Sequence, residues 1–100
     1  MADQHIPIDD NTGHVTPPHD NQHLSKLNDD EAVWDDANNT GPFSVEFNPK
    51  HHPFTQWKFM VQKGGSTASG PVVTGDPGDT FDYKINGTKT TNDPRIIIDG

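Results

Sequence analysis

Short runs of alternating apolar and polar residues, separated by turn-forming residues, limit this chain to a small set of folds. Phe43, Val45 and Phe47 alternate with polar residues, and the same pattern recurs at residues 57–61 and 81–85. Alternation with a period of two places the apolar side chains on one face of a β-strand. No segment sustains the 3.6-residue period of an amphipathic helix over ten residues. The chain is therefore predicted to be all-β.

Turn signals recur about every ten residues, which is typical of a β-sandwich. The strongest turn signal is Gly75-Asp76-Pro77-Gly78-Asp79, and Gly64 to Gly70 is expected to be a flexible connection before a short apolar Val72-Val73 run. Ile6-Pro7-Ile8 is expected at a sheet edge because proline lacks an N–H donor. Ile96-Ile97-Ile98 is expected to be a final strand buried on both faces. We predict a Greek-key β-sandwich of seven or eight short strands.

A chain of 100 residues is long enough for one domain and one core. We expect a single domain over residues 1–100, in which residues 1–23 form a polar, partly flexible segment with an edge strand. Residues 24–98 are expected to form the sandwich core. Trp34 and Trp57 are expected to be buried in it, and the alternative is an exposed aromatic platform for a sugar or a peptide.

The charge balance is strongly acidic, with 15 Asp and Glu against 7 Lys and Arg and a formal net charge of −8. Nucleic acid is not expected as a partner, because phosphate binding depends on clustered Lys and Arg. We expect an acidic, soluble domain with no membrane insertion, and a protein partner stays open. No signal peptide is apparent, so a cytoplasmic location and a mature exported form are both open. The absence of cysteine excludes disulfides and thiolate ligands.

Two segments resemble the halves of a cupredoxin core, the plastocyanin-like β-sandwich. Val33-Trp34-Asp35-Asp36 leads into an Asn-containing loop and then Pro42 to Phe47, in which Phe43 stands where that family has its first copper-binding histidine. The turn at Pro77-Gly78 and the strand through Phe81 and Tyr83 resemble the second half, with Ile85 where the ligand cysteine falls. The resemblance covers roughly residues 24–98, including the closing strand Ile96 to Ile98.

The resemblance implies a cupredoxin-like frame without type 1 copper. A type 1 site needs two histidines, a cysteine thiolate and a weak axial ligand that is often methionine. Phe43 and Ile85 replace two of these ligands, and residues 86–94 contain neither histidine nor methionine. The electron-transfer role of the family is therefore not expected here. Another immunoglobulin-like sandwich is the alternative, and it predicts the same fold class.

The six histidines are the candidates for another kind of metal site, because neutral imidazole is a common metal ligand. A flexible segment could bring spaced imidazoles around Cu(II), Ni(II) or Zn(II), whereas adjacent histidines in a strand point to opposite faces. The alternative is that all are solvated side chains without a specific role, and no other cofactor is expected. The candidates are His5, His14, His19, His23, His51 and His52.

The sequence shows no catalytic pattern, and we expect no enzyme and no catalytic residues. Ser44, Ser66 and Ser69 lie in no nucleophile motif, and Asp36 to Gly41 lacks the glutamate that would complete a calcium loop. The main hypothesis is a non-enzymatic, cupredoxin-like binding or assembly module without type 1 copper. A metal-binding protein that uses surface histidines is the alternative, and a carbohydrate-binding or small-ligand-binding sandwich is the third possibility.

Overall fold

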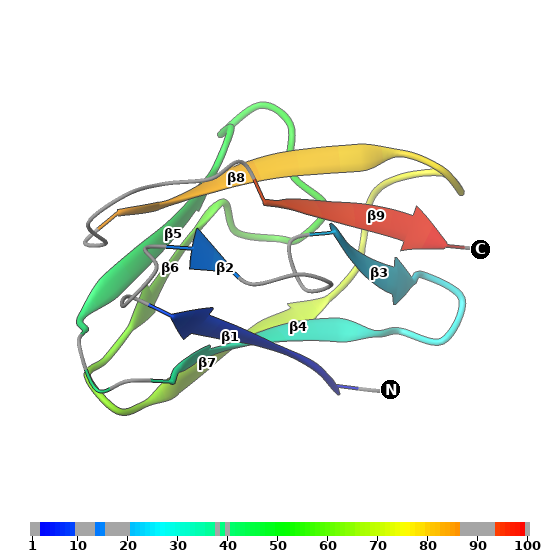
Figure 1. The fold of residues 1–100 in the computed structure, drawn as a ribbon. Helices are drawn as coiled ribbons and strands as arrows, with labels where there is room; N and C mark the ends of the chain where they lie inside the picture. The colour runs from blue at the N-terminus through cyan, green and yellow to red at the C-terminus, as the bar shows by residue number, and fades with distance from the viewer. Residues whose placement is uncertain are drawn as a thin grey trace.

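The protein is a β-sandwich of two mixed sheets, seen in a computed structural model that describes residues 3–9, 14–15, 21–37, 39, 41–86 and 94–99 (Figure 1). These ranges form nine β-strands and no helix, where the turn spacing predicted seven or eight strands. The all-β prediction is confirmed. None of these ranges contains a helix long and apolar enough to cross a membrane. The strands are β1 (Asp3–Asp9), β2 (His14–Val15), β3 (Asn21–Ser25), β4 (Glu31–Asp36), β5 (Phe43–Phe47), β6 (Lys58–Val61), β7 (Ser66–Pro71), β8 (Thr80–Asn86) and β9 (Arg95–Asp99).

Each sheet joins an N-terminal strand to a strand much further along the chain. The four-stranded sheet has the order β2-β1-β4-β7, and the five-stranded sheet has the order β3-β9-β8-β5-β6. β1 pairs in parallel with β4, and β3 pairs in parallel with β9, whereas the other pairs are antiparallel. Figure 1 shows both parallel pairs, with β1 beside β4 and β3 beside β9.

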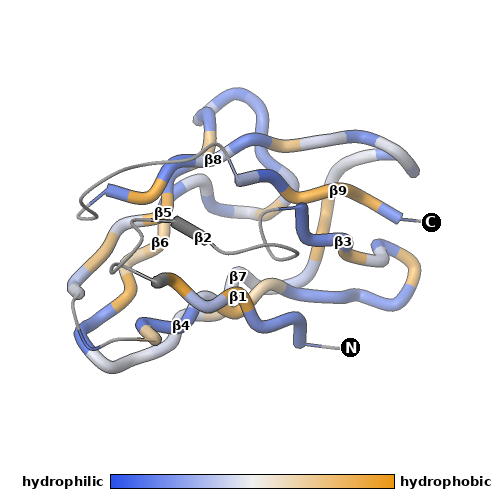
Figure 2. Tube along the Cα trace, in the orientation of Figure 1, coloured by the Kyte–Doolittle hydropathy of each residue, from blue (hydrophilic) through white to orange (hydrophobic). Residues whose placement is uncertain are grey.

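The core lies between the sheets and is centred on Trp34, which is fully buried as predicted. Its ring packs against four other aromatic rings with centroids 5.2 to 6.3 Å away, and its Nε1 donates a hydrogen bond to the Tyr83 hydroxyl at 3.3 Å. Figure 2 shows apolar stretches on β1, β5 and β9 and hydrophilic stretches along the loops. The core residues are Ile6, Ile8, Leu24, Ala32, Trp34, Phe43, Val45, Phe47, Phe54, Phe59, Val61, Val72, Phe81, Tyr83, Ile85, Ile96 and Ile98.

The two clearest predicted strands are confirmed and lie next to each other. Side chains of β5 and β8 alternate between buried and less buried positions along the whole of each strand. The strands pair with Val45 opposite Ile85 and Phe47 opposite Tyr83, so both apolar faces point into the core. The predicted turn is also present, because the Asp79 amide donates to the Asp76 carbonyl at 2.9 Å.

β1 differs from its predicted place at a sheet edge, because it lies between β2 and β4. β2 pairs with it only at Ile8 and Asp9, so the missing N–H of Pro7 interrupts no pair on that side. Ile6 and Ile8 are fully buried in the common core. The core therefore begins well before residue 24.

The segment predicted as a flexible connection contains a strand instead. β7 forms the edge of the four-stranded sheet, with Thr67 opposite Trp34. A register shift between Glu31 and Val33 leaves the Ala32 amide without a strand partner, and this amide donates to Ser69 Oγ at 2.9 Å. Pairing with β4 thus overrides the weak strand propensity of serine and glycine. The apolar run at Val72 and Val73 follows β7, which ends at Pro71, and only Val72 is buried.

Two predictions of complete burial were also wrong. Trp57 precedes β6 and is 37% exposed, although Phe59 and Val61 of the same alternating run are buried. Ile97 is only half-buried, because it lies on the outer face of β9 while Ile96 and Ile98 face the core. One face of each sheet is thus turned away from the core, and the side chains there are available for contacts outside the sandwich.

Candidate functional site

The two positions that the cupredoxin resemblance assigns to copper ligands lie at one end of the sandwich. Phe43 begins β5 and Ile85 lies near the end of the antiparallel β8, with Val45 opposite Ile85. Both side chains are buried, at 1% and 4% exposed. Hydrocarbon side chains have no atom that can bind a metal ion, so these residues do not fit copper. They complete the core at this end instead.

Four of the six candidate histidines have described side chains, and each has one ring nitrogen near an acceptor. Nδ1 of His5 lies 2.9 Å from Asp35 Oδ2, and Nδ1 of His23 lies 2.9 Å from Asp99 Oδ1. His51 Nε2 lies 3.3 Å from the Thr80 carbonyl, and His52 Nδ1 lies 2.7 Å from the Phe54 carbonyl. His14 is in β2, but its side chain, like all of His19, lies outside the described residues.

These histidines are oriented individually but are not gathered into one site. A ring nitrogen bonded to a carboxylate or carbonyl is the arrangement that fixes a metal-binding imidazole. However, His5 is in β1, His23 is in β3, and His51 and His52 are in the loop after β5. Among the residues that the structure describes, no group of three or more His, Cys, Asp or Glu side chains is placed to hold a metal ion.

On the outer face of the four-stranded sheet, a histidine, an aspartate and a serine form a line across three strands. Asp35 is in the middle, within 2.9 Å of His5 Nδ1, and it accepts a second hydrogen bond from Ser66 Oγ. A serine nucleophile needs the histidine between serine and aspartate, so that the imidazole can take the hydroxyl proton. The order found here gives Ser66 no such base. This line connects β1, β4 and β7, and we assign it a structural role.

The same outer face is acidic. It carries Asp3, Glu31 and Asp35 beside His5, and the described residues of β1, β4 and β7 include no Lys or Arg. Asp3 stands opposite Glu31 in the parallel register. A hydrogen bond in which the protonated Glu31 carboxyl donates to the Asp3 carboxylate, together with desolvation by burial and repulsion from Asp3, raises the pKa of Glu31.

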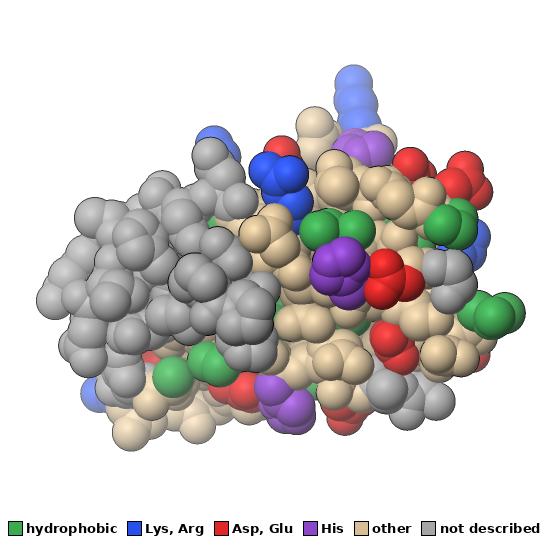
Figure 3. Space-filling view, turned by 45° about the vertical axis from the view of Figure 1, so that its right-hand side comes forward, with side chains coloured by type: hydrophobic (Ala, Val, Ile, Leu, Met, Phe, Trp, Pro, Cys, Tyr) green, Lys and Arg blue, Asp and Glu red, His purple; other side chains and the backbone are tan. Residues whose placement is uncertain are grey.

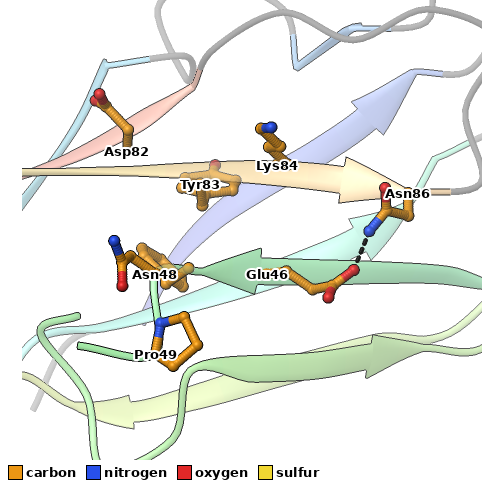
Figure 4. Close-up of a pocket in the computed structure, with 8 residues that line it drawn as sticks. Glu46, Asn48, Pro49, Asp82, Tyr83, Lys84 and Asn86 are labelled. Carbon is orange, nitrogen blue, oxygen red and sulfur yellow. Dashed lines mark hydrogen bonds between the residues drawn. The ribbon is translucent and has the colours of Figure 1, made fainter. Parts of the chain in front are cut away.

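The outer face of the five-stranded sheet is balanced in charge and contains a groove of about 580 Å³ over β5 and β8 (Figure 4). Lys58, Glu46 and Lys84 stand opposite one another on three neighbouring strands. Basic side chains on the side of the molecule drawn in Figure 3 are scattered and form no patch. The groove is lined by Glu46, Phe47, Asn48, Pro49, Asp82, Tyr83, Lys84 and Asn86.

Most of the acidic groups in this groove already have partners. Glu46 Oε2 accepts hydrogen bonds from Ser44 Oγ at 3.2 Å and from Asn86 Nδ2, the pair joined by a dashed line in Figure 4. Asp82 Oδ1 lies 3.6 Å from Arg95 Nε. The ammonium group of Lys84 has no hydrogen-bond or ion-pair partner within the described part of the chain. Lys84 is therefore the cation that this groove leaves available to a ligand.

Sequence reasoning identified the residues of the groove only as the polar positions of two strands. The alternation in residues 43–47 and 81–85 predicts that Glu46, Asp82 and Lys84 face away from the core. No pattern in the sequence indicates that these two strands are neighbours, and the groove depends on that pairing. Comparisons with protein-family models, with curated proteins and with solved structures gave no match to this chain.

Proposed function

We propose that the protein is a non-enzymatic binding module built on a cupredoxin-like frame that holds no type 1 copper. The observation that carries this proposal is the position of Phe43 and Ile85, on adjacent strands at one end of the core. The segments that resemble the two halves of the cupredoxin core contribute adjacent strands, and the two positions that the resemblance assigns to ligands carry buried apolar side chains, which supports the proposal. A Greek-key connection of the strands belongs to the same proposal.

The groove over β5 and β8 is the proposed ligand site. It offers an ammonium group without a partner among the described residues, two amides and two carboxylates on a sheet surface, which suits a small polar ligand that both donates and accepts hydrogen bonds. An anionic group of the ligand would lie against Lys84. The two aromatic residues that line the groove, Phe47 and Tyr83, are only 3% and 2% exposed, which favours a small polar molecule over a carbohydrate stacked on a ring.

Titration with metal ions tests the proposal against the alternative that the protein binds a metal through its histidines. The chain has no cysteine, so Cu(II) cannot form the thiolate bond that gives type 1 copper its intense blue absorption. The informative measurement is therefore histidine NMR during titration with Cu(II), Ni(II) and Zn(II), in which we expect no saturable binding to one set of histidines. Saturable binding of one ion at sub-micromolar concentration, with shifts confined to one set of histidines, would favour the metal-binding alternative.

Titration of the groove tests the ligand site. Glycine, glutamate, glucose and inorganic phosphate are added separately while backbone amide shifts are recorded. We expect saturable shifts confined to β5 and β8 with at least one probe that carries a carboxylate or phosphate, and their loss in Lys84→Gln. Lys58→Gln is the matched control, because Lys58 is exposed on the same sheet face but does not line the groove. Unchanged amide shifts with all four probes would contradict the proposed site.

A further inference from the structure

Within the described part of the chain, the N-terminal part of β1 pairs with another strand on one side only. Its parallel ladder with β4 runs from Asp3 to Ile8, whereas β2 pairs with it only at Ile8 and Asp9. Residues 3–7 therefore have one described strand neighbour, although they belong to a strand in the interior of the sheet. Ile6 and Ile8 are fully buried and anchor the second half of the strand. The first half has no fully buried side chain to hold it in the core, and Asp3 and His5 are exposed.

Two side-chain pairs on the outer face connect this first half to β4. Asp3 is opposite Glu31, and His5 Nδ1 lies 2.9 Å from Asp35 Oδ2. The two pairs differ in kind. The first brings together two carboxyl groups, which attract each other only while one of them keeps a proton. The second contains a possible cation and an anion, and Ser66 from β7 also donates to Asp35.

Among the described side chains, four titratable groups lie along the boundary between β1 and β4 on the outer face of the sheet. β1 contributes Asp3 and His5, and β4 contributes Glu31 and Asp35. β7 contributes no titratable side chain, because its six residues are Ser, Thr, Ala, Ser, Gly and Pro. No Lys or Arg of these strands can neutralise a second negative charge at the carboxyl pair. When both carboxyl groups are ionised, no Lys or Arg of these strands reduces their mutual repulsion.

We propose that the first half of β1 is a pH-dependent clasp, which is closed on β4 while Asp3 and Glu31 share one proton and is loosened when both are ionised. The parallel register allows the proton to be shared, because it places the carboxyl groups of Asp3 and Glu31 side by side at the start of β1. Loosening is confined to residues 3–5, because Ile6 and Ile8 remain packed in the core.

The closed form retains the Glu31 proton to a higher pH than the open form does. This difference sets the direction in which pH shifts the equilibrium between them. The hydrogen bond with Asp3 raises the pKa of Glu31 above its ordinary value when the strand is in place. A carboxyl group whose pKa is raised in the closed form stabilises that form at low pH, and this stabilisation is lost as the pH rises through the raised pKa. The clasp therefore closes on acidification and opens towards neutral pH.

Amide hydrogen exchange measured by NMR between pH 4 and pH 7 tests the clasp in the full chain. After correction for the intrinsic exchange rate, the opening constant of residues 3–5 should rise with pH. Linkage fixes the size of this rise: each unit by which the Glu31 pKa of the closed strand exceeds that of the open strand corresponds to about tenfold in the opening constant. The Glu31 pKa itself is measured by side-chain carboxyl NMR on the same samples.

Two variants separate the clasp from a general effect of pH. Asp3→Asn removes one ionisable group but keeps hydrogen-bonding atoms, so the part of the pH dependence that follows the Glu31 pKa of the wild-type protein should be lost while β1 stays paired. Glu31→Gln should do the same from the other strand, and it serves if Asp3→Asn disturbs the fold. Asp82→Asn on the other sheet should leave the pH dependence unchanged.

Three outcomes would overturn the proposal. The first is an opening constant of residues 3–5 that does not change with pH in the wild-type protein. The second is a pH dependence over the range in which Glu31 titrates in the wild-type protein that persists unchanged in both Asp3→Asn and Glu31→Gln. The third is an equal rise in the opening constants of residues 3–5 and of β9, which would mean that the whole sandwich responds to pH and not the clasp.

Discussion

The carboxylate of Asp36 is expected to be the most important single polar group for stability at one end of the sandwich. Asp36 ends β4 and is 7% exposed. Its Oδ2 accepts hydrogen bonds from the Gly41 amide at 2.8 Å and from the Gly64 amide at 2.9 Å. One oxygen thus connects the loop before β5 to the turn between β6 and β7. Removing it leaves two backbone donors without their acceptor.

The expected magnitude follows from these two bonds. A hydrogen bond to a charged group contributes about 1.5–3 kcal/mol, and a neutral one contributes about 0.5–1.5 kcal/mol. Asp36→Ala removes both charged bonds, and partial access of water to the freed amides limits the loss to about 3 kcal/mol. Asp36→Asn keeps an acceptor oxygen and should lose about 1 kcal/mol per bond, which gives about 2 kcal/mol in total. Either loss is a large part of the stability of a small domain.

Urea unfolding followed by tryptophan fluorescence measures these losses, and thermal unfolding should show a lower Tm by about 4–8 °C for each kcal/mol. Asp82→Ala is the control, because the Asp82–Arg95 ion pair is exposed and should be worth less than about 1 kcal/mol. A loss for Asp36→Ala no larger than that of the control would refute the reasoning. Equal losses for the Ala and Asn variants would show that the charge, and not the acceptor atom, is what matters.

Three further measurements test other parts of the structure. Ile6→Ala should lower the free energy of unfolding by about 2–5 kcal/mol, as for a fully buried core residue, and a loss below about 1 kcal/mol would place β1 outside the core. Ser69→Ala should cost about 1–3 kcal/mol in the same urea assay, because the buried Ala32 amide loses its acceptor; a neutral result would mean that another acceptor replaces Ser69 Oγ. The free energy of unfolding should fall as the pH rises through the raised pKa of Glu31, and Glu31→Gln should remove that component; a Gln variant with the wild-type pH profile would contradict the assignment.

The parts of the fold that could be predicted from sequence are those in which local patterning and tertiary structure agree. The alternating residues of β5 and β8 have one apolar face each, so their strand conformation and their buried side follow from the sequence alone. β7 could not be predicted in this way, because Ser, Thr and Gly become a strand only by pairing with β4. The place of β1 depends on a parallel partner more than twenty residues away, and no local signal indicates that partner.

For the candidate site too, the sequence predicts which residue types are present but not which residues become neighbours. The sequence indicates that Phe43 and Ile85 are apolar where copper ligands would lie, but only the pairing of β5 with β8 brings these residues to one end of the core. The histidines stand out in the composition, but the sequence does not indicate their partners, because Asp35 and Asp99 come from strands distant in the sequence. Lys84 was predicted to be outward-facing, yet its lack of a partner depends on the side-chain directions of its neighbours.

The parallel pairing of β3 with β9 has a consequence for how the protein folds. β3 lies near the start of the chain and β9 near its end, so their ladder, with Leu24 opposite Ile98, closes a loop that contains most of the sequence. Contacts between residues so far apart form late, because the entropy of loop closure must be overcome before they are made. During synthesis on the ribosome, β3 has no partner in its sheet until residues 95–99 have emerged. Leu24, which is fully buried in the finished fold, lacks the neighbouring strand residue Ile98 until then.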